Sequence, residues 1–326
     1  MKLGILGTGM IVKDLLTTID KFDLESVYVL GVKETEEEVK ELCGKYHLDG
    51  YYLDYDELLS KEIDTVYVAL PNFLHYAFAK KALEHGKHVI IEKPVTANAT
   101  ELKELIQIAK EKDLIILEAM NIHYLPAYLR LKEYLPEIGD IKIVSFNYSQ
   151  YSSRYNAFKE GTILPAFDYH KAGGALMDLN VYNIHGIVGL FGRPQSIQYQ
   201  ANIEKGIDTS GILTLDYGSF QAVSIGAKDC KAPVTLTLQG DKGVICMHKP
   251  INQIRAFEYI NNDNEVTTID LDEGNHRLYY EFTEFIRIID KNDKEKAAEM
   301  LEISLTVSEI MEKARKQQGI VFDNDK

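Results

Sequence analysis

The chain has 326 residues and a formal net charge of -14, which argues against a nucleic-acid partner because phosphate backbones are bound by basic surfaces. Its 45% hydrophobic and 26% charged residues are ordinary for a soluble protein, and no apolar run reaches the ~18–20 residues of a membrane span. Cys43, Cys230 and Cys246 are widely spaced, odd in number and form no CxxC motif, so they fit reduced thiols in a cytoplasmic protein better than a disulfide framework or a metal site.

The N-terminal part of the chain alternates strand-like and helix-like patterns, which is typical of β-α-β units around a parallel sheet. The expected strands are 2–6, 26–30, 65–70, 88–91 and 114–118, and the expected helices are 10–19, 36–45, 75–85 and 99–112. One hydrophobic core stops growing at roughly 250–300 residues, so a second domain is expected. We place the first domain at residues 1–121.

The pattern changes after Asn121, where short strands are separated by tight turns. The expected strands are 142–149, 209–217, 220–225, 234–238 and 243–247, and helical apolar spacing follows near 282–289 and 301–311. We therefore predict that residues 122–326 form an α+β domain with a mostly antiparallel sheet flanked by helices. The last four residues, 323–326, are expected to fray.

A glycine-rich turn follows the first strand, at Gly7-Thr8-Gly9-Met10-Ile11. Gly7 permits a tight turn, and Gly9 lets the backbone approach a pyrophosphate at a helix N-terminus. The fingerprint expects a small residue three positions after the second glycine, where this chain has Val12. We predict dinucleotide binding by residues 7–11, with looser helix–strand packing at Val12.

The choice between NAD and NADP depends on the end of the second strand. An acidic residue there binds a ribose 2′-hydroxyl, whereas a basic residue accepts a 2′-phosphate. The sequence carries Lys33 and then Glu34, one residue of each sign, so both cofactors stay open.

Glu92-Lys93-Pro94 stands where the buried strand 88–91 ends. Ligands of an open parallel sheet bind beyond the carboxyl ends of the strands, so Lys93 is placed for chemistry there. The simpler interpretation is an exposed charge pair at a strand-to-loop junction. The glycine-rich turn favours a role of Lys93 in chemistry over a simple surface charge pair.

Three polar side chains of the second half share helical spacing: Asp178, Tyr182 and His185. Intervals of four and three residues put them on one helix face, where they would line one wall. The simpler alternative for Tyr182 is a core tyrosine with a hydrogen-bonded hydroxyl. For His185 we favour a supporting or core role.

Taken in order, these motifs resemble the glucose–fructose oxidoreductase / inositol dehydrogenase / rhizopine-catabolism (Gfo/Idh/MocA) family of NAD(P)-dependent oxidoreductases. The resemblance covers nearly the whole chain and also includes Pro71-Asn72 with His75, and Gly173-Gly174 before Asp178. It implies a Rossmann domain, a second domain with an open sheet often used for dimerisation, and an active site between them. A homodimer or a dimer of dimers is therefore expected.

The resemblance also implies roles for individual residues. It makes Lys93 and Asp178 catalytic, and it implies a cis bond before Pro94. Tyr182 stands where many members have histidine, as in the dihydrodiol dehydrogenase-like branch, and this counts against an inositol dehydrogenase. The expected cofactor-binding residues are Gly7, Thr8, Gly9, Met10, Ile11, Lys33, Leu70, Pro71, Asn72, His75, Glu92 and Lys93.

Substrate contacts are expected from the second domain, and no metal is expected because no His/Asp/Glu group has ligand spacing. The candidate substrate-binding residues are His123, Tyr151, Arg154, His170 and His185. None of these residues identifies the substrate.

The expected reaction is hydride transfer between a nicotinamide and a secondary alcohol or carbonyl of a small sugar, polyol or diol. A free tyrosine has a pKa of about 10, and a nearby ammonium favours its phenolate. We therefore assign Tyr182 as acid/base, Lys93 as its electrostatic partner, and Asp178 as the group that orients Lys93 or a substrate hydroxyl. Lys93 as the proton donor is the close alternative. Other classes are a nucleotide-sensing regulator on the same fold and a reductase of a non-sugar carbonyl.

Overall fold

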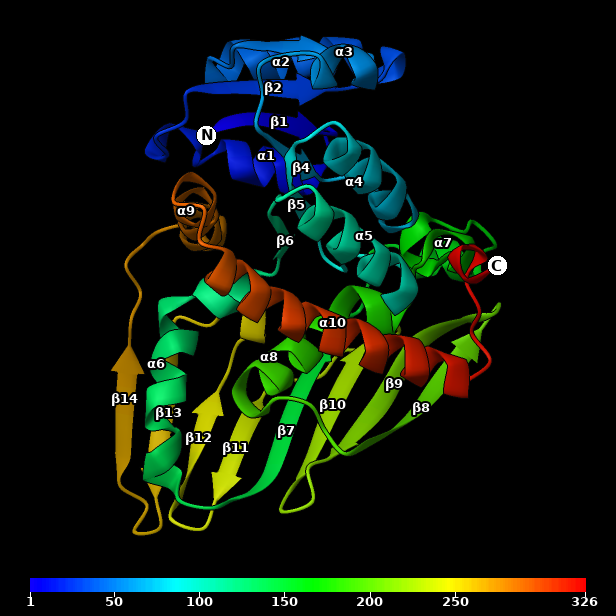
Figure 1. The fold of residues 1–326 in the computed structure, drawn as a ribbon. Helices are drawn as coiled ribbons and strands as arrows, with labels where there is room; N and C mark the ends of the chain where they lie inside the picture. The colour runs from blue at the N-terminus through cyan, green and yellow to red at the C-terminus, as the bar shows by residue number, and fades with distance from the viewer. The chain divides into compact units, whose positions relative to one another are not determined.

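Two sheets organise the chain, and the computed structural model describes residues 1–326 (Figure 1). One unit comprises Met1–Ala119 together with Leu278–Leu305, and the other comprises Met120–Arg277 together with Thr306–Lys326. The first unit therefore includes a segment from far along the chain, which a simple cut at residue 121 assigns to the second half.

The first unit is built on a six-stranded sheet in the order β3-β2-β1-β4-β5-β6, with every pairing parallel. Its strands are β1 (Lys2–Leu6), β2 (Ser26–Leu30), β3 (Gly50–Tyr52), β4 (Thr65–Val68), β5 (His88–Glu92) and β6 (Ile116–Ala119). This is the doubly wound order of dinucleotide-binding folds, in which the direction of strand succession reverses between β1 and β4. The prediction of a Rossmann sheet is confirmed.

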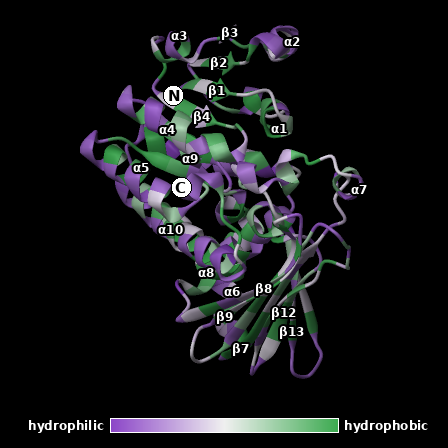
Figure 2. Cartoon of the chain, turned by 90° about the vertical axis from the view of Figure 1, so that its right-hand side faces the viewer, coloured by the Kyte–Doolittle hydropathy of each residue, from purple (hydrophilic) through white to green (hydrophobic).

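Helices cover both faces of this sheet. The helices of the unit are α1 (Met10–Leu16), α2 (Glu36–Tyr46), α3 (Tyr55–Leu59), α4 (His75–Glu84), α5 (Ala99–Glu111) and α9 (Arg277–Asp290). Leu83 of α4 and Leu105 of α5 share a buried cluster with Val66 and Val89 of the sheet. On the opposite face the ring of Tyr67 meets Phe282 of α9 edge-on, with centroids 5.1 Å apart. Figure 2 shows hydrophilic and hydrophobic residues alternating around α4 and α5, as amphipathic covering helices require.

The second unit contains an open eight-stranded sheet in the order β14-β13-β12-β11-β7-β10-β9-β8. The strands are β7 (Ile141–Ser149), β8 (Ser196–Glu204), β9 (Ile207–Asp216), β10 (Gln221–Ala227), β11 (Leu236–Gly240), β12 (Gly243–Met247), β13 (Ala256–Asn261) and β14 (Val266–Asp270). Only the central β7–β10 pair is parallel, so the predicted mostly antiparallel sheet is confirmed.

The helices of the second unit are α6 (Pro126–Tyr134), α7 (Tyr155–Lys159), α8 (Val181–Phe191) and the end of α10 (Lys294–Gln317). Helix α8 packs closely on the sheet because Gly186 lacks a side chain: a Cβ there would lie 3.0 Å from the Phe146 ring of β7. None of the helices is both long enough and apolar enough to cross a membrane.

Several elements differ from the sequence prediction. Helix α1 ends at Leu16, followed by a separate 3-10 turn at Ile19–Lys21. The edge strands β8 and β14 were not predicted, because their residues are mostly polar and exposed and carry little hydrophobic alternation.

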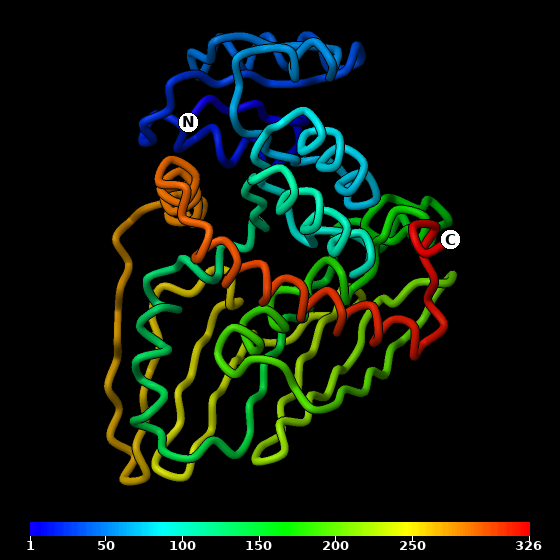
Figure 3. Tube along the Cα trace, viewed as in Figure 1, coloured from blue at the N-terminus to red at the C-terminus, as the bar shows by residue number.

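The prediction of a frayed C-terminus is wrong. The side chain of Arg315 is only 1% exposed, and it donates two hydrogen bonds of 2.5 Å to the carboxylate of Asp325. Its guanidinium also lies over the Phe322 ring, with 4.2 Å to the centroid. Figure 3 shows the terminal segment in red beside green segments of the same unit, and there Asp323 bonds His170 at 2.7 Å.

Candidate active site

The glycine-rich turn after β1 is shaped for close approach of a ligand to its backbone. Gly7 has φ +105°, and a Cβ there would lie 2.8 Å from the Ala69 carbonyl oxygen, so the position requires glycine. Gly9 caps α1 in an extended conformation, and a Cβ on it would meet no atom within 4 Å. The amides around Gly9 are therefore approachable, and the turn fits the pyrophosphate of a dinucleotide.

The residues around this turn occupy different environments. Met10 is 72% exposed, whereas Val12 is fully buried, so the valine fits into the packing between helix and sheet. The Thr8 hydroxyl donates to Glu38 Oε2 at 2.9 Å, and Lys13 Nζ lies 2.5 Å from Glu38 Oε1. The hydrogen bond from Lys13 is the main cause of the lowered pKa of Glu38. Sequence reasoning missed Glu38, because no local pattern links it to a residue 30 positions earlier.

The end of β2 carries no acidic side chain. Gly31 follows the strand, and a Cβ on it would lie 2.4 Å from Val39 Cγ2. Lys33 and Glu34 come next, in an exposed 3-10 turn, Lys33–Thr35. The position directly after the strand thus cannot hold the carboxylate expected for a ribose 2′-hydroxyl.

His75 joins the loops that follow β4 and β5. Its ring is fully buried, with Nε2 2.7 Å from the carbonyl oxygen of Leu70 and Nδ1 2.9 Å from that of Pro94. Burial lowers the pKa of His75 because it disfavours the charged ring. Pro71 and Asn72 lie in the loop that His75 holds. The neutral ring carries one N–H and donates it to one of these two carbonyl oxygens, so His75 lies between the two loops, and its contact with the cofactor stays a prediction.

Lys93 stands at the carboxyl end of β5 with fixed backbone on either side. The Lys93–Pro94 peptide bond is cis, as the family resemblance implied. Glu92 is buried; its carboxylate accepts from the Tyr67 hydroxyl at 2.5 Å and from the Lys93 N–H at 3.2 Å. The Val95 N–H donates to Glu118 Oε1 at 3.0 Å. The Lys93 side chain itself is only partly buried.

Glu118 is a supporting residue that the sequence could have indicated. It occupies the carboxyl end of β6, paired in register with Ile91 of the neighbouring strand. An acidic residue at the end of a buried strand was the signal that identified Glu92, and the same signal was present here.

The helix that carries Asp178 and Tyr182 is irregular. Leu176–Asn180 forms a π-helical turn, and α8 begins only at Val181. The assumption of one regular α-helical face through positions 178, 182 and 185 is therefore wrong, because a π turn contains more residues. Such turns often occur at functional sites.

Each of these three side chains has a different neighbour within the second unit. Asp178 Oδ2 lies 2.7 Å from Lys228 Nζ. The Tyr182 side chain is buried, with its ring centroid 6.2 Å from that of Tyr148. His185 is buried beside His123, and its Nδ1 lies 3.2 Å from Nε2 of His123.

The candidate substrate residues also have protein partners. His123 and His185 form the buried pair just described, and His170 pairs with Asp323 of the C-terminal segment. Tyr151 is 39% exposed and donates its hydroxyl hydrogen to Asn156 Oδ1 at 2.7 Å. Arg154 is exposed and precedes α7.

One buried carboxylate beneath the Gly173-Gly174 segment was not foreseen. Asp208 accepts from the Leu176 N–H at 2.7 Å and from the Tyr199 hydroxyl at 2.8 Å, and burial raises its pKa to about 6. Gly174 has φ +108°, and a Cβ on it would lie 2.1 Å from Asp208 Oδ1. The second glycine of the motif is thus required by both conformation and space.

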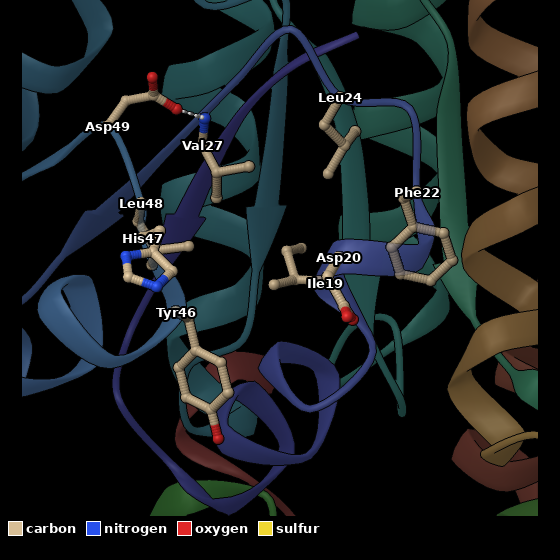
Figure 4. Close-up of a pocket in the computed structure, with 9 residues that line it drawn as sticks. All are labelled: Ile19, Asp20, Phe22, Leu24, Val27, Tyr46, His47, Leu48 and Asp49. Carbon is tan, nitrogen blue, oxygen red and sulfur yellow. Dashed lines mark hydrogen bonds between the residues drawn. The ribbon is translucent and has the colours of Figure 1, made fainter.

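A small hollow of about 180 Å³ lies elsewhere in the first unit, lined by Ile19, Asp20, Phe22, Leu24, Val27, Tyr46, His47, Leu48 and Asp49 (Figure 4). These residues lie at the amino ends of β2 and β3, whereas the glycine-rich turn and Lys93 follow carboxyl ends. The hollow is therefore separate from the candidate site, and the dashed line in Figure 4 marks its Asp49 carboxylate accepting from the Val27 N–H.

Comparison with known families agrees with this geometry. Residues 1–120 match an oxidoreductase family with an NAD-binding Rossmann fold, and residues 128–246 match the C-terminal domain of the same family. The chain belongs to the Gfo/Idh/MocA family of oxidoreductases. It is an NAD(P)-dependent enzyme of the dehydrogenase and reductase class.

Two characterised relatives align with the full length of this Gfo/Idh/MocA protein. The scyllo-inositol 2-dehydrogenase (NADP(+)) of Bacillus subtilis is 34% identical, with 100% of this chain and 99% of the relative covered. The trans-1,2-dihydrobenzene-1,2-diol dehydrogenase of Mus musculus is 27% identical, with 100% and 99% covered.

Solved structures share the fold. A 3-ketoreductase from Actinomadura kijaniata, in complex with NADP and TDP-benzene, superposes with a TM-score of 0.84. It is 19% identical, and 97% of each chain is covered.

Proposed function

We propose that this enzyme is an NADP-dependent dehydrogenase that oxidises a secondary hydroxyl of a cyclic polyol, or reduces the matching ketone. The observation that carries the proposal is the end-to-end identity of 34% with the Bacillus subtilis scyllo-inositol 2-dehydrogenase (NADP(+)). The mouse dihydrodiol dehydrogenase supports vicinal diols as the second substrate class. In this proposal the first unit binds the nucleotide and the second unit binds the substrate.

The test is the absorbance of reduced nicotinamide during incubation with inositol stereoisomers, D-xylose and trans-1,2-dihydrobenzene-1,2-diol. Each substrate is offered with NADP⁺ and with NAD⁺. We expect the highest kcat/KM for an inositol with NADP⁺. Turnover of trans-1,2-dihydrobenzene-1,2-diol alone would favour the second class. No turnover, combined with nucleotide-dependent binding to another protein, would indicate a regulator.

The proposed chemistry assigns one task to each polar residue. Bound nicotinamide supplies the hydride acceptor for oxidation, or the donor for reduction. Tyr182 accepts the proton of the substrate hydroxyl, and Lys93 supplies positive charge that favours the phenolate and polarises the carbonyl. Asp178 orients either Lys93 or a second hydroxyl of the substrate.

Lys33 is the residue that we propose contacts the 2′-phosphate of NADP. Gly31 excludes a side chain after β2, and Lys33 is the first cation beyond it. We expect Lys33→Glu to weaken NADP⁺ binding ~10-fold or more and to leave NAD⁺ binding within about twofold. The reason is that Lys33 makes its charge-assisted contact with the 2′-phosphate, which NAD⁺ lacks. Nucleotide titration by calorimetry measures both constants.

Lys45→Glu is the matched control for Lys33→Glu, since it makes the same charge change in the last turn of α2. It should leave both nucleotide affinities unchanged. Equal losses of NADP⁺ affinity in the two variants would show that net charge causes the effect. Lys33 would then not be a ligand of the 2′-phosphate.

We propose that the protein forms a homodimer, or a dimer of dimers, through the outer face of the eight-stranded sheet. Ile143 and Ile212 are 47% and 46% exposed there, and Ile212 is in register with Ile225 of β10. Aliphatic residues exposed on several neighbouring strands are typical of an interface. Ile212→Glu should give a monomer in sedimentation velocity, whereas the equally exposed loop variant Ile163→Glu should sediment as the wild type does.

A cytoplasmic location is also proposed, supported by Cys43, Cys230 and Cys246, which are all free thiols. Cell fractionation with immunodetection tests this location, and recovery outside the cytoplasmic fraction would overturn it.

A further inference from the structure

We infer that Lys228 is the positioning residue of Asp178, and that it fixes this carboxylate as an acceptor for a substrate hydroxyl. The inference rests on the proposed function and decides between the two tasks left open for Asp178. Lys228 immediately follows β10, and no sequence motif marks it.

The surroundings of Lys228 are unusual for a lysine, because its side chain is only 2% exposed. Its Nζ donates to Asp178 Oδ2 at 2.7 Å and to the carbonyl oxygen of Ala166 at 2.7 Å. The ammonium also lies 4.4 Å from the centroid of the Phe167 ring. A buried ammonium is costly unless it is paired and hydrogen-bonded, and these contacts meet that need.

The two partners differ in accessibility. The Asp178 side chain is 36% exposed, whereas Lys228 is enclosed. The carboxylate is therefore the member of the pair that a ligand can reach, and the ammonium orients it from behind. Lys228, a lysine of the same unit, thus supplies a counter-ion to the Asp178 carboxylate.

Strand β10 holds the π-helical turn at a second point. Asn180 accepts from the Ser224 hydroxyl at 2.6 Å, and Asn183 donates to the Ile225 carbonyl at 3.0 Å. All three polar side chains are fully buried. The turn that carries Asp178 is thus attached to β10 through amide hydrogen bonds near Asn180 and through the ion pair with Lys228.

The Gly173-Gly174 motif completes the same assembly. A Cβ on Gly173 would lie 2.5 Å from the Pro165 carbonyl oxygen and 3.0 Å from the Ala166 carbonyl carbon. Glycine therefore lets the loop containing Ala166 pack against the start of the turn. That packing places the Ala166 carbonyl where Lys228 donates to it. The Gly173-Gly174 motif and Lys228 therefore both support the conformation of the turn that carries Asp178.

The test is a double-mutant cycle on the full chain, made from Asp178→Asn, Lys228→Met and the double variant. We expect Lys228→Met to lower kcat/KM ~10- to 100-fold, mainly through KM, with the dissociation constant for NADPH unchanged. In the Asp178→Asn background the same change should have less than a twofold further effect, because Lys228 acts through the carboxylate. If the losses of kcat/KM from the two single substitutions multiply in the double variant, the proposal is wrong. Unchanged kcat/KM in Lys228→Met would also overturn it.

Lys205→Met is the matched control. Lys205 also donates to a backbone carbonyl, that of Phe158, and lies over the ring of Phe158, but it has no carboxylate partner. It should keep kcat/KM within about twofold. If Lys228→Met fails to fold, Lys228→Gln replaces it in the cycle, since an amide retains hydrogen-bond donors without the charge.

Failure of the proposed function is recognised separately. In that case the wild type turns over no member of the substrate panel. The urea midpoints of the same variants then test the ion pair alone: the double variant should lose less stability than the two single variants combined. Additive losses would show that Lys228 does not position Asp178.

Discussion

Replacing Lys93 with methionine is expected to lower kcat by ~10³-fold or more while the dissociation constant for NADPH stays within about twofold. The side chain is partly buried at the carboxyl end of β5, and its backbone N–H bonds the buried Glu92. Methionine keeps a long unbranched side chain but removes the cation that favours the Tyr182 phenolate and polarises the substrate carbonyl. Steady-state turnover and fluorescence titration of NADPH measure the two quantities.

Lys110→Met is the control for this variant, because Lys110 lies on the exposed side of α5 in the same unit. Its kcat should equal that of the wild type. Near-normal turnover in Lys93→Met would remove Lys93 from the mechanism. A large loss of NADPH affinity would instead make it a nucleotide ligand.

Replacing Tyr182 with phenylalanine is expected to lower kcat by ~10²–10⁴-fold, the usual contribution of a general acid or base. The ring that packs near Tyr148 is retained, so thermal stability should change little. The same variant separates the two proton-transfer schemes. If Lys93 donates the proton, Tyr182→Phe keeps most of its activity and the wild-type dependence of kcat on pH.

Tyr217→Phe is a matched loss of one hydroxyl in the same unit, since Tyr217 donates only to the Gly192 carbonyl. It should retain wild-type kcat. A comparable loss of activity in both variants would assign the effect of Tyr182→Phe to packing rather than to proton transfer.

The features that sequence predicted well are local. Gly7 and Gly9 follow a short buried strand, and their residue type indicates a tight turn and a close approach to the backbone. Glu92-Lys93-Pro94 stands at the end of another buried strand, and the family resemblance implied the cis bond before Pro94. Strand periodicity then places both at carboxyl ends of one parallel sheet. The family resemblance added the connection to Asp178 and Tyr182.

The features that sequence missed depend on contacts between distant residues. Thr8 with Glu38 and Asp178 with Lys228 are pairs separated by 30 and 50 positions. No period or motif links such partners, because their proximity follows from the packing of whole elements. The π-helical turn at Leu176–Asn180 was missed for a related reason: buried bonds to β10 support it, and helical spacing alone implies a regular helix.

The contribution of α9 to the first unit determines when this unit can complete its folding during synthesis and where the chain can be cut into fragments. The Tyr67 ring is covered by Phe282, and the amino group of Met1 lies 3.2 Å from Asp290. A ribosome releases these partners only after the whole of the second sheet has been made. The nucleotide-binding unit therefore begins first but is completed only after the second sheet, and a fragment that stops at residue 120 lacks the Phe282 ring that covers Tyr67.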